Sequence, residues 1–168
     1  MRFGPLLATV VLAGCASLPP GAPPAASAPA FDPIAFFSGH TQGNGRIRIA
    51  VRRSVALHVD GWGSVERDGS LHLVQTVIEG NKPPVHRDWR VARSPDGAWR
   101  GTLSDARGPV LVTASGNRLR IRFAMAHGLA AEQWLVLEPG GQATRNRLIV
   151  RKFGIMIARV DERIVRLP

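Results

Sequence analysis

Apolar and polar residues alternate over short runs in most of the chain beyond residue 31. The clearest run is 118–125, in which every second residue is apolar and three arginines stand between them. Its apolar positions are Leu119, Ile121, Phe123 and Met125. Residues 46–52 repeat the pattern, with Ile47, Ile49 and Val51 on the apolar side. A period of two is typical of a β-strand that buries one face.

Turn signals separate these runs, namely Asn44-Gly45, Asp68-Gly69, Asp96-Gly97, Gly116-Asn117 and Gly140-Gly141. Asn-Gly and Asp-Gly suit β-hairpin turns because both residues tolerate a positive φ. We therefore predict an antiparallel meander of about ten strands. Their approximate spans are 46–53, 55–66, 70–79, 85–94, 98–104, 110–115, 118–127, 132–138, 145–151 and 155–165. So many strands must either pack as a sandwich or close into a barrel, which removes the exposed edges.

One short helix is predicted where this region begins. Asp32 suits the N-cap position and Pro33 the first helical position. Phe36 and Phe37 follow within the same segment. We expect these two rings to plug one end of the sheet assembly.

Residues 1–30 have a different character. Arg2 precedes a short apolar run that ends in Leu12-Ala13-Gly14-Cys15, which is similar to the lipobox of bacterial lipoprotein signals. We expect residues 1–14 to be a lipoprotein signal peptide and Cys15, the only cysteine, to carry the lipid. An ordinary signal peptide is the alternative. Residues 15–30, rich in proline and alanine, predict an extended tether, and residues 31–168 a single domain.

This reading also predicts where the protein works. A lipidated Cys15 anchors the chain to a membrane, so the bacterial cell envelope is the expected location. Ala16 follows the cysteine, where an aspartate indicates retention at the inner membrane by the sorting rule known for enteric bacteria. The outer membrane, facing the periplasm, is therefore favoured.

Charge adds a candidate surface. The chain has 22 lysines and arginines against 12 acidic residues, a formal net charge of +10. Arginine's planar guanidinium suits phosphate geometry, and a positive surface concentrates anionic partners. The candidate contacts to anionic lipid are Arg46, Arg48, Arg118, Arg120 and Arg122. The alternative is a solvated basic face without a partner. No nucleic-acid partner is expected, because export removes the chain from the cytoplasm and no binding signature is present.

The aromatic residues are apolar, since the chain has four tryptophans, six phenylalanines and no tyrosine. The candidate ligand-lining residues are Trp62, Trp89, Trp99, Phe123 and Trp134. Aromatic-lined barrels commonly hold an apolar ligand, with plain core packing as the alternative. Trp89 and Trp99 flank a predicted hairpin turn, so we also expect them to meet as a cross-strand pair.

The sequence gives little support for a catalytic or a metal-binding site. Gly61-Trp62-Gly63-Ser64-Val65 departs from the Gly-x-Ser-x-Gly nucleophile elbow, because Glu66 stands where that motif has glycine. The five histidines are scattered without a metal-binding spacing, and no second cysteine is present. We expect no enzyme activity, no metal and no cofactor.

Several short segments resemble a known family. They are Ala35-Phe36-Phe37-Ser38-Gly39, Trp89-Arg90-Val91, Asp96-Gly97-Ala98-Trp99-Arg100-Gly101-Thr102, Gly116-Asn117-Arg118-Leu119-Arg120, Asn146-Arg147-Leu148 and Arg151-Lys152-Phe153-Gly154-Ile155. The chain is similar to an uncharacterised family of proteobacterial lipoproteins, domain-of-unknown-function family 3833. The resemblance implies an all-β, single antiparallel lipocalin-like barrel of about eight to ten strands on a lipid tether, and no established catalytic residues.

Two functions of different kinds remain. The first is an envelope lipoprotein whose barrel binds or carries an apolar ligand, fatty-acyl or lipid. The second is a structural or interaction lipoprotein whose basic face docks on anionic lipid or an acidic partner. An enzyme acting on lipids comes third. Barrels of about eight strands either fill their interior with side chains or hold one small ligand, so fold alone does not choose.

Overall fold

The computed structural model describes residues 29–50 and 52–168. The predictions for the signal peptide, Cys15 and most of the tether, and for Val51, lie outside the described residues. The elements in chain order are α1 (Pro33–Phe37), β1 (Gly39–Ile49), β2 (Val55–Val65), β3 (Leu71–Glu79), β4 (Val85–Arg93), β5 (Trp99–Leu103), β6 (Val110–Ser115), β7 (Arg118–Met125), the 3₁₀ turn η1 (Ala126–Gly128), β8 (Leu129–Leu137), β9 (Ala143–Lys152) and β10 (Ile155–Arg166). Among these residues no helix is long and apolar enough to cross a membrane.

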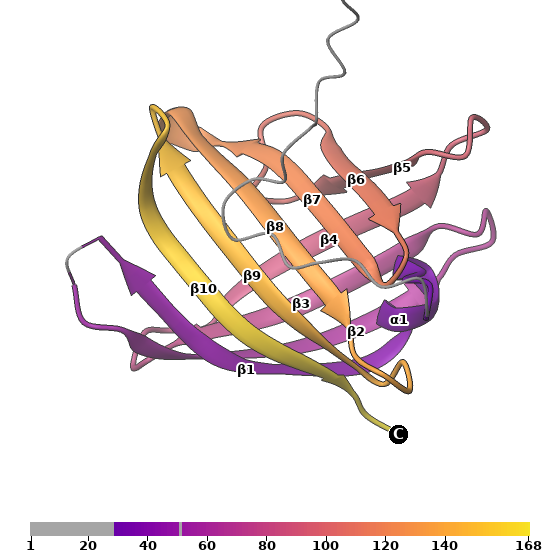
Figure 1. Ribbon diagram of the computed structural model, residues 1–168, viewed down its shortest axis with the longest axis horizontal. Coiled ribbons are helices and arrows are strands. Elements are labelled where there is room, and N and C mark those ends of the chain that lie inside the picture. Colours follow the sequence, from indigo (N-terminus) through magenta and orange to yellow (C-terminus); the bar gives the residue numbers. More distant parts are fainter. Residues whose placement is uncertain (1–28, 51) are drawn as a thin grey trace, which may run out of the picture.

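The ten strands form one closed antiparallel barrel (Figure 1). Each strand pairs with its neighbours in the chain, and β10 closes the sheet by pairing with β1, where Ile47 lies opposite Val160. Closure gives every strand two partners, so no sheet edge is left exposed. The all-β prediction is confirmed, and of the two predicted arrangements the barrel is the one observed.

Strand β1 differs from its prediction. It begins at Gly39 rather than Arg46, and the predicted turn Asn44-Gly45 lies inside it. Gly45 pairs with Glu162 of β10, and a Cβ there would lie 2.3 Å from the carbonyl oxygen of Asp161. The glycine therefore allows a close approach of two strands, and reading it as a turn signal was wrong.

The predicted alternation sets the inner and outer faces of the barrel. In β7, Leu119, Ile121 and Phe123 are at most 8% exposed, whereas Arg118, Arg120 and Arg122 alternate with them on the outer face. The apolar positions of the other strands continue the same interior. This alternation of inward and outward residues decides which side chains can contact a ligand inside the barrel and which can contact an external partner.

Helix α1 closes one end of the barrel, as predicted. The carboxylate of Asp32 accepts hydrogen bonds from the backbone N–H groups of Ile34 and Ala35, at 2.8 and 3.0 Å. Phe36 and Phe37 are buried, with ring centroids 4.9 Å apart, and the ring of Phe31 lies 5.3 Å from Phe36. The three rings form a plug against the apolar interior.

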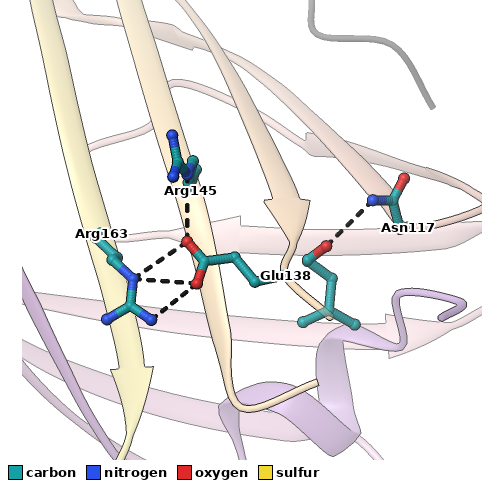
Figure 2. Close-up of polar contacts among 5 residues, drawn as sticks. Asn117, Glu138, Arg145 and Arg163 are labelled. Atoms are coloured by element: carbon teal, nitrogen blue, oxygen red, sulfur yellow. Dashed lines mark hydrogen bonds and ion pairs between the residues drawn. The ribbon is translucent and has the colours of Figure 1, made fainter. Parts of the chain in front are cut away.

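The β8–β9 turn lies at this same closed end (Figure 2). Glu138 accepts hydrogen bonds from Arg163 at 2.8 Å and from Arg145 at 3.3 Å. These arginines lower the pKa of Glu138, with the Arg163 hydrogen bond as the largest cause. Asn117 ties the neighbouring β6–β7 turn to β8 by donating to the Leu137 carbonyl oxygen at 3.1 Å. At the other end, residues 29–50 and 52–168 form no such plug, and we call this end the open rim.

Candidate ligand-binding site

The barrel encloses a mainly apolar cavity of about 140 Å³. Its wall runs from Phe37 and Leu71 near the closed end to Val150 and Ala158 near the open rim. A small volume spread over the length of the barrel makes the cavity narrow and elongated. Pockets for drug-sized ligands occupy about 300–1,000 Å³. A small cavity of this extent suits a slender ligand such as a single apolar chain.

Two carboxylates lie on the wall of this apolar interior: Glu79, which is paired with Lys82 at 2.6 Å, and Glu162. Asn146 donates to Oε2 of Glu162 at 2.8 Å, while Oε1 of Glu162 is buried and has no hydrogen-bond partner among the described residues. Burial raises the pKa of Glu162. Gly43 of β1 makes room for the group, because a Cβ at that position would lie 1.8 Å from Oε1.

Two further buried oxygen atoms beside Glu162 lack partners within the described part of the chain. They are Oδ1 of Asn146 and Oγ1 of Thr144, both on β9. Glu162 and Asn146 are register partners, so three such oxygens lie along the β9–β10 pair. A buried polar atom without a partner costs about 1–3 kcal/mol. Asn146 and Glu162 line the cavity and Thr144 does not, so Oε1 of Glu162 and Oδ1 of Asn146 are the wall atoms best suited to meet a polar atom of a ligand.

Polar side chains of β3 and β4 complete the wall. Nε of Arg87 donates to Asp105 at 2.8 Å, and the charge of Arg87 partly opposes the rise in the pKa of Glu162. Gln75 lies opposite Arg87 in the register, and its Oε1 accepts from the indole N–H of Trp89 at 2.8 Å. Most of the polar capacity on this side of the cavity is thus already used within the protein.

Sequence reasoning missed Glu162, although its signal was present. In β10 every second residue from 158 to 164 faces the interior, and the residues are Ala158, Val160, Glu162 and Ile164. A carboxylate in phase with three apolar residues is a candidate buried acid. This pattern indicates a buried acid more strongly once Gly43 and Gly45 are known to lie beside Glu162. That placement is known only from the pairing of β1 with β10.

Trp89 and Phe123, two of the predicted ligand-lining residues, do line the cavity. Their rings meet edge to face with centroids 5.9 Å apart. Contact with a ligand stays a prediction. Trp99 packs against the core but is not part of the cavity wall. The predicted Trp89–Trp99 pair is wrong, because Trp89 pairs with Leu103 in the register of β4 and β5.

The interior placement predicted for Trp62 and Trp134 is wrong. Trp62 is 61% exposed and stacks on the imidazole of His40 at 4.1 Å. Trp134 is 6% exposed, but it lies on the outer face, where the guanidinium groups of Arg118 and Arg120 cover its ring at 5.0 and 4.9 Å. The stems of arginines, rather than the barrel interior, bury this tryptophan.

The five candidate arginines lie in two separate places. Arg118, Arg120 and Arg122 follow the outer face of β7, where Arg120 is paired with Glu132. Arg46 and Arg48 lie on β1, which is separated from β7 by β8, β9 and β10 in the barrel order. The two sets therefore do not adjoin each other, and Arg147 and Arg159 on the strands between them are paired with Asp161. Their contact with anionic lipid stays a prediction.

One outer-surface cluster has the residue types of a hydrolase. Ser64, His72 and Asp88 lie on β2, β3 and β4, and His72 contacts Asp88 at 2.7 Å. The hydroxyl of Ser64 donates to Glu66 at 3.3 Å instead of to His72. Ser64 also lies within a strand, unlike the strand-to-helix turn of a nucleophile elbow. Within residues 29–50 and 52–168, no group of three potential metal ligands comes together.

A closed antiparallel barrel around an apolar cavity with a few polar groups defines the class of lipocalin-like β-barrels. Within that class, the chain belongs to the family described as Protein of unknown function (DUF3833), whose sequence profile matches residues 9–166. The family resemblance and the lipocalin-like fold expected from the sequence are confirmed.

Among solved structures, the chain is similar to the S-type phycobiliprotein lyase CPES from Guillardia theta. The TM-score is 0.64 at 8% sequence identity, and the alignment covers 80% of this chain and 90% of the lyase. At this identity the likeness shows the fold alone. No curated protein matches the chain.

Proposed function

We propose that this protein is a carrier that holds one single-chain apolar ligand, such as an acyl chain, inside its barrel. The observation that carries the proposal is the combination of a narrow apolar cavity with two buried oxygens of its wall residues, Oε1 of Glu162 and Oδ1 of Asn146, that have no partner among the described residues. Apolar walls supply affinity, and a few placed polar groups orient a ligand. A barrel that served only as a scaffold gains nothing from leaving these atoms without hydrogen bonds.

The polar end of such a ligand is uncharged in this proposal. The charge of Arg87 on the cavity wall is already balanced by Asp105 at 2.8 Å, so it offers little surplus attraction to an anion in the cavity. Glu162 is itself acidic, and two carboxylates in one apolar space repel each other. A hydroxyl group of the ligand can donate to a buried oxygen of Glu162 or Asn146 without adding a buried charge. A hydroxyl-bearing acyl ester or a long-chain alcohol fits these conditions better than a free fatty acid.

The location is part of the same proposal. A lipid on Cys15 would hold the carrier at a bacterial envelope membrane, preferably the outer membrane facing the periplasm. The residues between Cys15 and the barrel would serve as a tether. The role proposed is binding without chemistry, since the Ser64 cluster is exposed and lacks the serine–histidine contact that catalysis requires.

The direct test is native mass spectrometry of the purified full chain, followed by organic extraction. Extraction releases a bound ligand, while a lipid attached to Cys15 stays with the protein and appears in its mass. We expect one extractable acyl species per barrel. A clean protein mass with no extractable lipid, from cells that make the protein in its own compartment, would overturn the carrier proposal.

A matched pair of variants separates cavity binding from surface binding. Ala158 lies on the cavity wall, so Ala158→Phe should fill the cavity and remove the extracted species. Ala92 is exposed on the outer face of β4, and Ala92→Phe should leave the species in place. Circular dichroism and thermal unfolding check that both variants fold. Equal retention of lipid by two folded variants would contradict binding in the cavity.

A further inference from the structure

The β9–β10 hairpin carries the largest exposed apolar side chains at the open rim. Phe153 is 86% exposed, Ile155 71% and Met156 55%. Phe153 also has a φ of 49°, in the left-handed region that favours glycine. Phe153 therefore costs folding free energy in two ways, through its backbone strain and through the exposure of its apolar ring. Such features are common at functional sites.

Neighbouring connections make this hairpin part of a larger surface. The N–H of Ala50, in the β1–β2 turn, donates to the Ile157 carbonyl oxygen at 2.6 Å. A Cβ on Gly128, in the β7–β8 connection, would lie 3.8 Å from the ring of Phe153. Figure 1 shows the hairpin at the end of the barrel opposite α1. Two other connections of the open rim therefore lie against the exposed hairpin.

The two ends of the barrel differ in charge. The rim connections 48–54, 79–85, 104–109, 126–129 and 151–156 hold seven cations and two carboxylates. The cations are Arg48, Arg52, Arg53, Lys82, Arg107, Arg151 and Lys152. The closed-end segments 29–38, 66–70, 93–98, 115–118, 138–142 and 163–168 hold five arginines and five carboxylates. An excess of positive charge thus surrounds the apolar hairpin, whereas the charges of the closed-end segments balance.

Most of the rim cations are available to an external partner. In the described part of the chain, Arg48, Arg52, Arg53, Arg107 and Lys152 form no ion pair with a carboxylate. Arg52 and Arg53 directly precede Ser54, whose hydroxyl accepts a hydrogen bond from Arg46. These three arginines and Arg48 border one shallow depression. Lys152 lies 5.7 Å from the ring of Phe153, so a cation stands directly beside the apolar tip.

We infer that the open rim is a docking surface for an anionic phospholipid bilayer, with Phe153 and Ile155 inserted among the acyl chains. The hairpin is a projecting tip, which enters a soft apolar phase without needing a shaped pocket. Rim arginines and lysines then lie at the level of the phosphate groups, where an anionic surface attracts them. An acidic protein would match the cations but not the exposed Phe153, Ile155 and Met156.

This docking orients the barrel. The cavity wall reaches Val150 and Ala158 near the rim, so the docked protein turns that end of the cavity toward the lipid. The inference of a docking surface nevertheless depends on the exposed rim residues and not on the cavity. The rim could prove not to bind a bilayer while the barrel still binds a ligand, and it could bind a bilayer while the barrel is empty.

The test compares variants of the full chain, so that any contribution of residues 1–30 is the same in each. Binding is measured by flotation with vesicles of phosphatidylcholine alone or mixed with phosphatidylglycerol. We expect the double variant Phe153→Ser with Ile155→Ser to bind the mixed vesicles at least about tenfold more weakly than the unchanged chain. The matched control, Val65→Ser with Val74→Ser, removes two exposed valines away from the rim and should bind unchanged.

A second readout reports orientation even if residues 1–30 dominate the affinity. Tryptophan is placed at the tip by Phe153→Trp or away from it by Val65→Trp, and vesicles contain lipids with brominated acyl chains. We expect stronger quenching of the tip tryptophan, weakened by high salt. Equal quenching at the two positions would overturn the inference, and so would quenching that is indifferent to phosphatidylglycerol. Loss of flotation by both double variants alike would also contradict a specific rim.

Discussion

Replacing Glu162 by glutamine tests whether a buried acid controls the barrel's stability. Glutamine keeps the shape of the side chain and an oxygen that can accept from Asn146, but it cannot ionise. Burial raises the pKa of Glu162 in the folded protein above the ordinary glutamate value of about 4.3. Between these two pKa values the folded state binds more protons than the unfolded state. The contribution of Glu162 is therefore present at low pH and is lost as the pH rises through its folded-state pKa.

The size of the effect follows from the proton count. A difference of at most one proton makes the free energy of unfolding fall by no more than about 1.4 kcal/mol per pH unit. The substituted glutamine side chain has no such dependence, so subtracting the Glu162→Gln curve isolates this one group from every other titration. We expect the unchanged protein to lose stability relative to Glu162→Gln as the pH rises from about 4.

Urea unfolding followed by circular dichroism, at pH values from about 4 to 8, measures this difference. The m-value should be the same for both proteins, because the same surface is exposed on unfolding. A difference that stays constant with pH would refute a perturbed Glu162. A difference that grows in favour of the unchanged protein would show that Arg87 and Asn146 outweigh burial and reverse the sign of the shift.

Three further predictions concern other parts of the barrel. Gly63→Ala should destabilise the fold by about 1–3 kcal/mol, because a Cβ there would lie 1.9 Å from the Phe37 carbonyl oxygen and displace the plug; unchanged thermal unfolding would contradict this close approach. Glu138→Gln should cost at most about 1 kcal/mol at neutral pH, as befits an exposed ion pair, and the cost should disappear as the pH falls and Glu138 is protonated in the parent. Trp62→Phe should remove most of the iodide-quenchable fluorescence, since Trp62 is 61% exposed, Trp99 is only partly exposed, and Trp89 and Trp134 are at most 8% exposed; quenching that the substitution leaves unchanged would contradict the exposure of Trp62.

The strand pattern was predictable because each strand buries one face. In β7 the sequence alternates without interruption, so its inward residues could be named directly. In β1 the first seven residues, Gly39–Gly45, are glycines and polar residues, which hide a strand from any hydrophobic pattern. Their place in the sheet is decided by pairing with β10 and by the space that Glu162 needs, and neither is a local property.

The candidate site was predicted in kind but only partly in detail. Aromatic identity alone placed Trp134 inside, whereas its place in the strand, between Gln133 and Leu135, lies on the outer face of β8. Its low exposure comes from Arg118 and Arg120 on the adjacent strand, a contact invisible without the register. The phase of a strand is therefore a better guide to a barrel interior than the size of a side chain.

Two residues that cost the folded protein stability lie at its proposed functional sites. A barrel selected for stability alone would place an aliphatic residue at position 162 and glycine at position 153, because a buried carboxylate and a left-handed phenylalanine both cost free energy. One of these residues lies on the cavity wall, and the other at the rim toward which that cavity extends. Phe153 and Glu162 thus lie along one route from the rim into the barrel. This is where a carrier that takes an apolar ligand from a membrane needs a group to enter the lipid and a group to meet the ligand's polar end.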